Sequence, residues 1–563
     1  MSTHFAWYPS SSQVTVPWNA RYSFPSQANK SNKSTPRIPP KNGAYFSPGQ
    51  TIRLEFPAQG YVNPQNTTII MDVVLNVPTP TSILGIDAGT AGAAESGVAR
   101  FQNNIQSIFQ RVRLLYGSTV LEDLNNYNVI VRNLTEWTAN SAHGTMDQST
   151  INEGIGGIVF AYPNTTIVSP PMPATYQASV LRDNLICVNV RQRYIHGAQL
   201  TTTTAGIYYG AGYLGHSDTP PGHVATTGYT PITRRYQINL ALGLFTQEKL
   251  IPTKYLASQL AIELTLEQSQ FCIYSNASSL TGSVFVNKPA TYGVGNVILL
   301  PEVLEFDVSY DAMFLKGLQE GGVPIKFSTW NTYTFSTSEQ SNVNLNISER
   351  QRSVKAIYVV QRRAQPKIGA DNGACFFDTS IDGLSTLRQY QYRIGARYFP
   401  GQPVECSSSV GGSKSNGGAE AWLELAKALN IVGDYRLSTP VNTSRWALQN
   451  AGGVLQENDF DTSVTHISNS TGVPTVLERS IAEDARSGTL GSQCFAMAVN
   501  LETSNGIEIS GLNAEEQSDI SFMATWKSPQ KSGASAVATN LEAYTFVDTM
   551  LILRENNMIE LIK

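Results

Sequence analysis

The chain has 563 residues, too many for one hydrophobic core, because single cores stop growing near ~250–300 residues. Charged residues make up only 15 %, below the ~25 % typical of soluble domains, while 44 Gly and 28 Pro supply many turns. This composition excludes coiled coils and helical solenoids, and a net charge of −4 excludes a bulk surface suited to a nucleic-acid backbone. We therefore expect about two domains rich in strands and loops.

Compartment signals point to a reducing environment. No apolar run approaches the ~18–20 residues of a membrane span, and the opening residues lack a basic region followed by an apolar core. Five widely spaced cysteines form no C-x-x-C pair, so we expect reduced thiols without a metal or a disulfide. They are Cys187, Cys272, Cys375, Cys406 and Cys494.

The first 45 residues differ from the rest of the chain. They are rich in Ser, Pro, Asn and Gln, contain no Asp or Glu, and the alternating strand pattern begins only near Thr51. Such a segment cannot bury enough apolar surface to fold alone, which predicts an extended arm. Its aromatic residues are costly to leave in water, which favours an arm ordered against protein or a polyanion over a solvated tail. Six of them lie between Phe5 and Phe24. Its candidate contact residues are Arg21, Lys30, Lys33, Arg37 and Lys41.

From residue 46 onward, apolar and polar residues alternate with the period of antiparallel strands. In the first half we predict strands at 52–56, 238–244, 260–266 and 304–310. In the second half we predict strands at 343–347, 390–398, 495–501 and 520–526. Long Gly/Pro/Ser loops between them favour β-sandwiches over βαβ units.

Two segments have helical spacing instead. Apolar residues from Val120 to Leu134 share one face, and Glu122 and Asp123 would lie in the first turn. A second short helix is predicted within residues 417–433. We expect both helices to pack on the flank of a sheet.

The order of these elements repeats. In each half an Arg-bearing strand leads into a helix and then into further strands, with the copies about 260–280 residues apart. We therefore predict an arm at 1–45, a first sandwich at 46–312 and a second sandwich at 313–563. The junction contains the strand-breaking sequence LQEGGVPI.

No motif for chemistry survives inspection. Residues 210–215 read GAGYLG, but the following HSDTPPGHV cannot open the helix that a dinucleotide site needs. His216 and His223 share a loop with Asp218 but lack a further spaced metal ligand, and Asp371 lacks the downstream Glu of a calcium loop. We predict no catalytic residues, no cofactor and no metal.

Four stretches give the sequence a family resemblance. It resembles the double jelly-roll major capsid proteins of small icosahedral double-stranded DNA viruses, particularly virophages and polinton-like viruses, over roughly residues 46–563. The stretches are RVRLLYGSTVLEDLNNYNVI (111–130), GNVILLPEVLEFDVSYDAMF (295–314), SERQRSVKAIYVVQRR (348–363) and LRQYQYRIGARYFPGQPV (387–404).

The resemblance implies an all-β fold of two tandem eight-stranded jelly rolls with short flanking helices. It also implies a homotrimeric, pseudo-hexagonal capsomer that tiles an icosahedral virion shell around DNA and is assembled inside the host cell. The expected partners are neighbouring trimers, a penton protein and minor capsid or cement proteins, and we expect no membrane span in the chain. We expect the arm to lie at the trimer base inside the shell, passing beneath neighbouring trimers, with at most weak DNA contact.

Two other functions remain open at this stage. A receptor- or glycan-binding β-sandwich, such as a fibre, spike or lectin, shares the polar composition but does not require two similar halves. A β-rich glycoside hydrolase or lyase would require clustered carboxylates in a cleft, and the sequence singles out no such pair.

Overall fold

The computed structural model describes most of the strands and leaves out long connecting segments. The described residues are 31–78, 96–101, 105–138, 197–201, 219–226, 229–276, 290–337, 341–363, 387–406, 419–431, 495–502, 510–515, 520–526, 539–554 and 558–562.

Residues 31–306, here the first unit, form two main antiparallel sheets. One has the order β1-β12-β4-β9, with β2 also paired to β12, and the other has the order β3-β10-β6-β7. The strands are β1 (Ser31–Ser34), β2 (Tyr45–Phe46), β3 (Thr51–Glu55), β4 (Tyr61–Pro78), β6 (Phe109–Tyr116), β7 (Thr119–Asn125), β9 (Tyr229–Ile238), β10 (Leu260–Leu266) and β12 (Thr291–Phe306).

Residues 323–562, here the second unit, repeat this arrangement. Their sheets have the orders β13-β20-β15-β18, with β21 also on β20, and β14-β19-β16-β17. The strands are β13 (Val323–Thr337), β14 (Asn342–Ile347), β15 (Val354–Arg363), β16 (Leu387–Ile394), β17 (Arg397–Glu405), β18 (Met497–Asn500), β19 (Ile520–Trp526), β20 (Thr539–Arg554) and β21 (Met558–Ile562).

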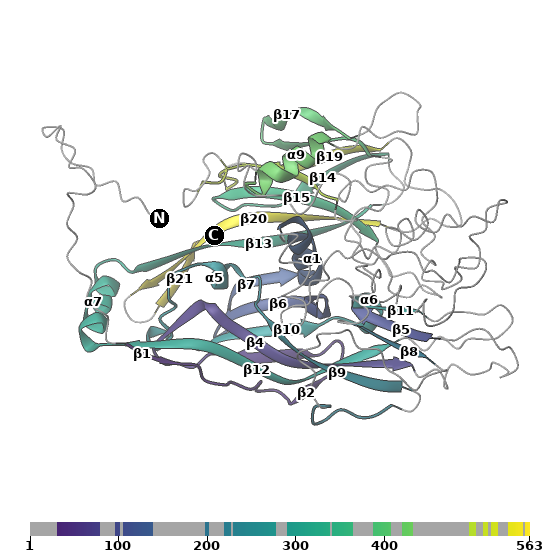
Figure 1. The fold of residues 1–563 in the computed structure, drawn as a ribbon. Coiled ribbons are helices and arrows are strands. Elements are labelled where there is room, and N and C mark those ends of the chain that lie inside the picture. The colour runs from purple at the N-terminus through teal and green to yellow at the C-terminus, as the bar shows by residue number, and fades with distance from the viewer. Residues whose placement is uncertain are drawn as a thin grey trace, which may run out of the picture.

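Eight strands of each unit match in chain order. Both sheet orders are reproduced when β1, β3, β4, β6, β7, β9, β10 and β12 are matched, in that order, with β13 to β20. Strands β2, β5, β8, β11 and β21 lie outside this match. Each unit also places one helix between the corresponding strands: α1 (Tyr127–Thr138) follows β7, and α9 (Ala419–Ala428) follows β17. The units lie side by side, with the second above the first in Figure 1. The predicted fold class, two tandem jelly rolls with short flanking helices, is confirmed.

The remaining elements lie at the ends and the seam. A small sheet, β11-β5-β8, lies at one end of the first unit, and α7 lies at the opposite end, where it leads into the second unit (Figure 1). The bounds are β5 (Ser96–Phe101), η3 (Ile105–Ile108), β8 (Gly197–Thr201), α5 (Gly243–Thr246), η5 (Thr253–Tyr255), α6 (Ser269–Cys272), β11 (Ile273–Asn276) and α7 (Val308–Gln319).

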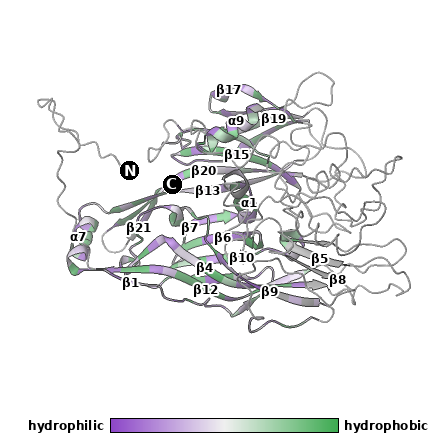
Figure 2. Ribbon diagram, in the orientation of Figure 1, coloured by the Kyte–Doolittle hydropathy of each residue, from purple (hydrophilic) through white to green (hydrophobic). Residues whose placement is uncertain are grey.

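Alternating side chains build the cores. Along β19, every second residue from Ile520 to Trp526 is buried, while Ser521, Met523 and Thr525 are half-buried. Figure 2 shows the same alternation of hydropathy along strands of both units. Fully burying each such side chain stabilises the fold by about 1.5–3 kcal/mol.

The first predicted helix starts later in the structure than the sequence pattern indicates. Residues 119–125 form strand β7, and the helix α1 starts only at Tyr127. Asn126 separates the two elements. Its φ of 50° lies in the left-handed region, which breaks the extended backbone of the strand and turns the chain into the helix. Glu122 and Asp123 therefore belong to a strand and not to a first helical turn.

Three predicted strands end differently in the structure. The strand predicted at 238–244 stops at Ile238, since the chain then turns into α5 with Leu242 and Leu244 still buried. The strand predicted at 304–310 stops at Phe306, where the Asp307 side chain accepts a hydrogen bond from the Val308 amide and caps α7. Residues 390–398 form a hairpin instead of one strand, with Gly395 at φ 58° in its turn.

The stretch predicted as the C-terminal part of the arm is extended and paired with the first unit. Strand β1 pairs with β12, Ile38 bridges to Leu299, and β2 pairs with Val294 and Gly295. Phe46 is buried in the core. Sequence patterning placed the first strand near Thr51, because β1 carries four exposed polar residues and has no apolar face to reveal it.

Candidate assembly surfaces

A buried carboxylate joins the two units. Glu122 of β7 accepts hydrogen bonds from the backbone amides of Gly243 and Leu244, both at 2.8 Å. It also accepts one from the Thr329 hydroxyl at 2.7 Å, and Thr329 lies on β13 of the second unit. Hydrogen bonds from three donors compensate the cost of burying this carboxylate, which is 1 % exposed.

A second buried carboxylate also contributes to the contact between the two units, which is here called the seam. Glu542 of β20 is fully buried and accepts from Arg362 Nε at 2.6 Å within the second unit. It also accepts from Asn126 Nδ2 of the first unit at 3.2 Å, and Tyr544 donates its hydroxyl to the same carboxylate. Each unit thus contributes one buried acid that binds a donor of the other.

Close packing completes the seam. Trp137 of α1 stacks on Tyr358 of β15, with ring centroids 5.4 Å apart, and Trp330 contacts the same tyrosine ring. At Gly243 a Cβ atom would meet the backbone oxygen of Ser328 at 2.0 Å, so only glycine fits this approach. Buried hydrogen bonds to carboxylates, stacked rings and a close backbone approach thus join the two units at several points.

Charged side chains line the outer face of the sheet β3-β10-β6-β7. Arg53, Glu263 and Arg113 lie directly opposite one another on adjacent strands. Glu263 accepts from Arg53 at 3.1 Å and from Arg113 at 2.5 Å, and Arg111 pairs with Asp123 at the strand edge. These pairs are partly exposed, and each contributes only about 0–1 kcal/mol.

Two of the five predicted arm residues are already paired with carboxylates of the first unit. Lys33 of β1 contacts Glu302 of β12 at 2.6 Å. Lys41 pairs with Glu55, and the hydrogen bond from Lys41 lowers the pKa of that carboxyl. Both lysines hold the arm to its own unit through these pairs.

The other three predicted arm residues are placed less fully. Arg37 is exposed between β1 and β2. Arg21 and Lys30 lie outside the described residues.

Cysteine and histidine placement bears on the predictions for metal and redox chemistry. Cys272 and Cys406 are buried free thiols, and burial raises the pKa of each; the other three cysteines lie outside the described residues. His223 forms a 3.0 Å hydrogen bond with Asn76 and meets the Tyr45 ring edge-on. His216, Asp218, Asp371 and residues 210–215 lie outside the described part of the chain. Within that part, no three His, Cys, Asp or Glu side chains gather as metal ligands, and no helix is long and apolar enough to span a membrane.

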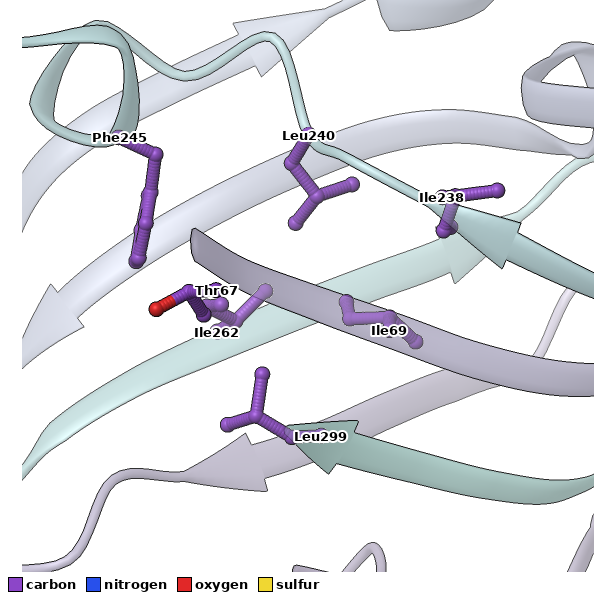
Figure 3. A pocket seen from close by; sticks show the side chains of 7 residues that line it. All are labelled: Thr67, Ile69, Ile238, Leu240, Phe245, Ile262 and Leu299. Atoms are coloured by element: carbon purple, nitrogen blue, oxygen red, sulfur yellow. The ribbon is translucent and has the colours of Figure 1, made fainter. Parts of the chain in front are cut away.

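A small cavity between the sheets of the first unit has no binding chemistry. It measures about 10 Å³, and Figure 3 shows that Thr67 supplies the one hydroxyl among six apolar side chains. This is the lower limit for one water, which needs two to four polar partners. It is a packing void. The lining residues are Thr67, Ile69, Ile238, Leu240, Phe245, Ile262 and Leu299.

Sequence reasoning missed the seam residues. Glu122 was read as a helix N-terminal residue, and its Thr329 partner lies 207 positions away. Glu542 carried a usable signal, since it is an acidic residue between buried Leu541 and Ala543 in an apolar strand. A charge inside an apolar run marks a buried, paired carboxylate.

Comparison with known proteins gives the fold but no relative by sequence. No protein-family model and no curated protein matches the chain. The major capsid protein of Faustovirus has a TM-score of 0.50 at 10 % identity, over 96 % of this chain and 93 % of that one. This likeness confirms the expected double jelly-roll fold.

Two virophage structures are also similar to this chain. The mavirus major capsid protein has a TM-score of 0.48 at 9 % identity, over 100 % of this chain and 95 % of that one. A chain of the Sputnik virophage has a TM-score of 0.47 at 10 % identity, over 99 % of this chain and 92 % of that one.

Proposed function

We propose that the chain is a viral major capsid protein, and that three copies form a pseudo-hexagonal capsomer which tiles an icosahedral shell around double-stranded DNA. The observation that carries this proposal is the repeated sheet order of two units fused side by side. Three such chains around a threefold axis place six similar barrels in a ring, and closed symmetry limits the assembly to a trimer.

The rigid seam supports this function. A capsomer can tile a flat facet only if its barrels keep a fixed orientation relative to one another. A flexible hinge between the two units would make its hexagonal outline variable. The bonds from Glu122 and Glu542 and the Gly243 contact fix the units at several points. A chain that binds a glycan or receptor through one sandwich has no need of such a seam.

The outer faces are suited to reversible lattice contacts. The row of Arg53, Glu263 and Arg113 offers polar groups that exchange partners with water at little net cost. Neighbouring capsomers and penton, minor capsid or cement proteins are the partners that we assign to such faces. The proposal assigns no reaction to the chain and places it in the virion after assembly inside the host cell.

We assign the strip around β1 to the inner side of the capsomer. Since Lys33 and Lys41 already pair with carboxylates, contact of this strip with packaged DNA would fall to the exposed Arg37. So few cations release few counterions, so the DNA contact is weak and salt-sensitive.

Mass measurement and imaging test the proposal. Light scattering on the purified full chain should give three times 61.3 kDa, and negative-stain images should show pseudo-hexagonal particles or shells. A stable monomer, or a trimer with three separate lobes joined by one sandwich each, would reject it. Specific glycan binding by a monomer would favour the alternative of a receptor- or glycan-binding protein.

A further inference from the structure

One face of helix α7 is fixed to the first unit. Tyr310 and Phe314 pack on Tyr61, with ring centroids 5.5 and 5.6 Å away. Asp311 accepts hydrogen bonds from the Tyr61 hydroxyl at 3.0 Å and from Lys254 at 2.6 Å, and the Lys254 bond lowers the pKa of this carboxyl. The helix is therefore a rigid element and not a flexible linker.

The opposite side of α7 is apolar and exposed. Val308, Ala312 and Leu315 follow the i, i+4, i+7 spacing of one helix face, and Met313 lies about 100° further round the helix from Ala312. Val308 is 79 % exposed, Met313 72 % and Leu315 45 %. Of the seven large apolar side chains exposed among the described residues, Val308, Met313 and Leu315 lie on α7 outside the face that packs on Tyr61, which marks a patch rather than scatter.

The chain enters the described fold beside this patch. β1 runs antiparallel to β12, and its first residue, Ser31, is paired with Phe306. Phe306 is followed directly by Asp307, the N-cap of α7, so Ser31 lies next to the start of this helix. A 30-residue segment reaches up to ~100 Å when extended, whereas α7 is only about 18 Å long.

The chemistry of residues 1–30 matches the patch. The segment contains six aromatic residues and no acid, with basic groups at Arg21 and Lys30. Exposed carboxylates of Glu305 and Asp307 lie at the N-terminus of α7, whereas Glu320 at the other end pairs with Lys316. Aromatic rings would cover the apolar stripe while the basic groups face the acids, and attachment at Ser31 gives the segment a high local concentration.

We propose that the exposed face of α7, formed by Val308, Ala312, Met313 and Leu315, is the docking site for residues 1–30 of the same chain. The segment lies over the helix that joins the two units and covers its apolar stripe. This inference rests on the single chain and does not depend on the capsid proposal.

Photo-crosslinking in the full-length protein identifies both the site and the source of the segment. With p-benzoylphenylalanine in place of Trp18, irradiation should give a product of single-chain mass on a denaturing gel. Peptide mapping should join the segment to residues 308–316. A double-mass product carrying this peptide would show docking of a second copy, and the absence of α7 peptides would show no docking there; either result overturns the proposal.

Proteolysis measures how firmly the segment docks. In the Val308→Ser/Leu315→Ser variant, trypsin should cut after Arg21 and Lys30 about tenfold faster than in the wild type, because cleavage follows the undocked population. Leu423→Ser, on the exposed side of α9, is the matched control and should leave both rates unchanged. Equal rates in the wild type and the double variant would contradict docking on α7.

Discussion

Strands β1 and β13 occupy the same place in their units but differ in strength. β13 pairs with β20 over all fifteen of its residues, and its Thr329 and Ser328 contact the first unit at the seam. The counterpart, β1, has four exposed residues, and the chain regains the sheet only at the Ile38 bridge and at β2. A strand covered by the other unit is long and regular, whereas the same strand at the open side is short and broken.

The outer sheet faces differ in the same way. The first unit carries the charged row of Arg53, Glu263 and Arg113. On the corresponding strands of the second unit the row is Asn344, Met523 and Gln391, none of them charged. If three chains form the proposed capsomer, its six barrels would alternate between a row with paired charges and a row without them, so the capsomer would be hexagonal in outline but threefold in the contacts made by this row.

Deletion of residues 1–46 should have the largest effect. It removes β1, β2 and the buried Phe46, and losing a phenylalanine from a core alone costs about 3–5 kcal/mol. Urea unfolding of the full chain and the deletion should show a loss confined to the first unit. Deletion of residues 1–30 is the matched control and should lower the unfolding midpoint far less, because it leaves β1, β2 and Phe46 in place. Equal midpoints for the two deletions would contradict a structural role for β1 and β2.

Gly243→Ala should be the next most damaging change. Alanine normally favours a helix over glycine by about 1 kcal/mol, but here its Cβ would overlap the Ser328 backbone and push the units apart, at a cost of about 3 kcal/mol. Calorimetry should show a lower and broader transition. Gly401→Ala, where no atom lies within 4 Å, is the control. A stabilised Gly243→Ala variant would show that the seam is loose.

Glu122→Gln should destabilise the seam by about 1–3 kcal/mol, because the amide loses charge and turns an NH₂ group toward the Gly243 and Leu244 donors. Asp123→Asn changes the adjacent residue, which pairs with Arg111 on the partly exposed face, and should cost under about 1 kcal/mol. Equal losses measured by chemical unfolding would contradict the difference between seam and outer face.

Lys33→Ala should have the smallest effect, under about 1 kcal/mol, because its partner pair is exposed on one side. Burial tends to raise the pKa of Glu302, but hydrogen bonds from Lys33, Asn63 and Asn66 bring it below the ordinary 4.5. A lowered carboxyl pKa stabilises the fold above 4.5, and this contribution is lost as pH falls through the folded value. The difference in the free energy of unfolding between wild type and variant should thus shrink as the pH is lowered. A difference that grows at acidic pH would contradict the Lys33–Glu302 ion pair.

Sequence patterning predicted the elements whose burial alternates, such as β10 and β19, because one face of each lies on a core. It missed β1, which has no apolar face, and misread β7, where Val120 and Leu124 fit a helical period as well as a strand. The seam could not be predicted from local sequence, because nothing near Glu122 distinguishes it from a surface acid. Its partner Thr329 lies far along the chain and is brought beside it only by the fold. Local pattern specifies elements, but contacts between units depend on the closed fold.

The seam is a head-to-tail contact between two like modules, and contacts of this kind have no natural end. The β7 side of the first unit meets the second unit, so the corresponding β17 side could in principle receive a third. β17 is an exposed edge strand and carries Pro400 and Pro403, which have no amide hydrogen to offer an incoming strand. The two prolines thus discourage strand pairing with another chain at this edge. The seam itself needs no strand pairing, since β7 and β13 touch while belonging to different sheets, so contacts between chains would form through side chains in the same way.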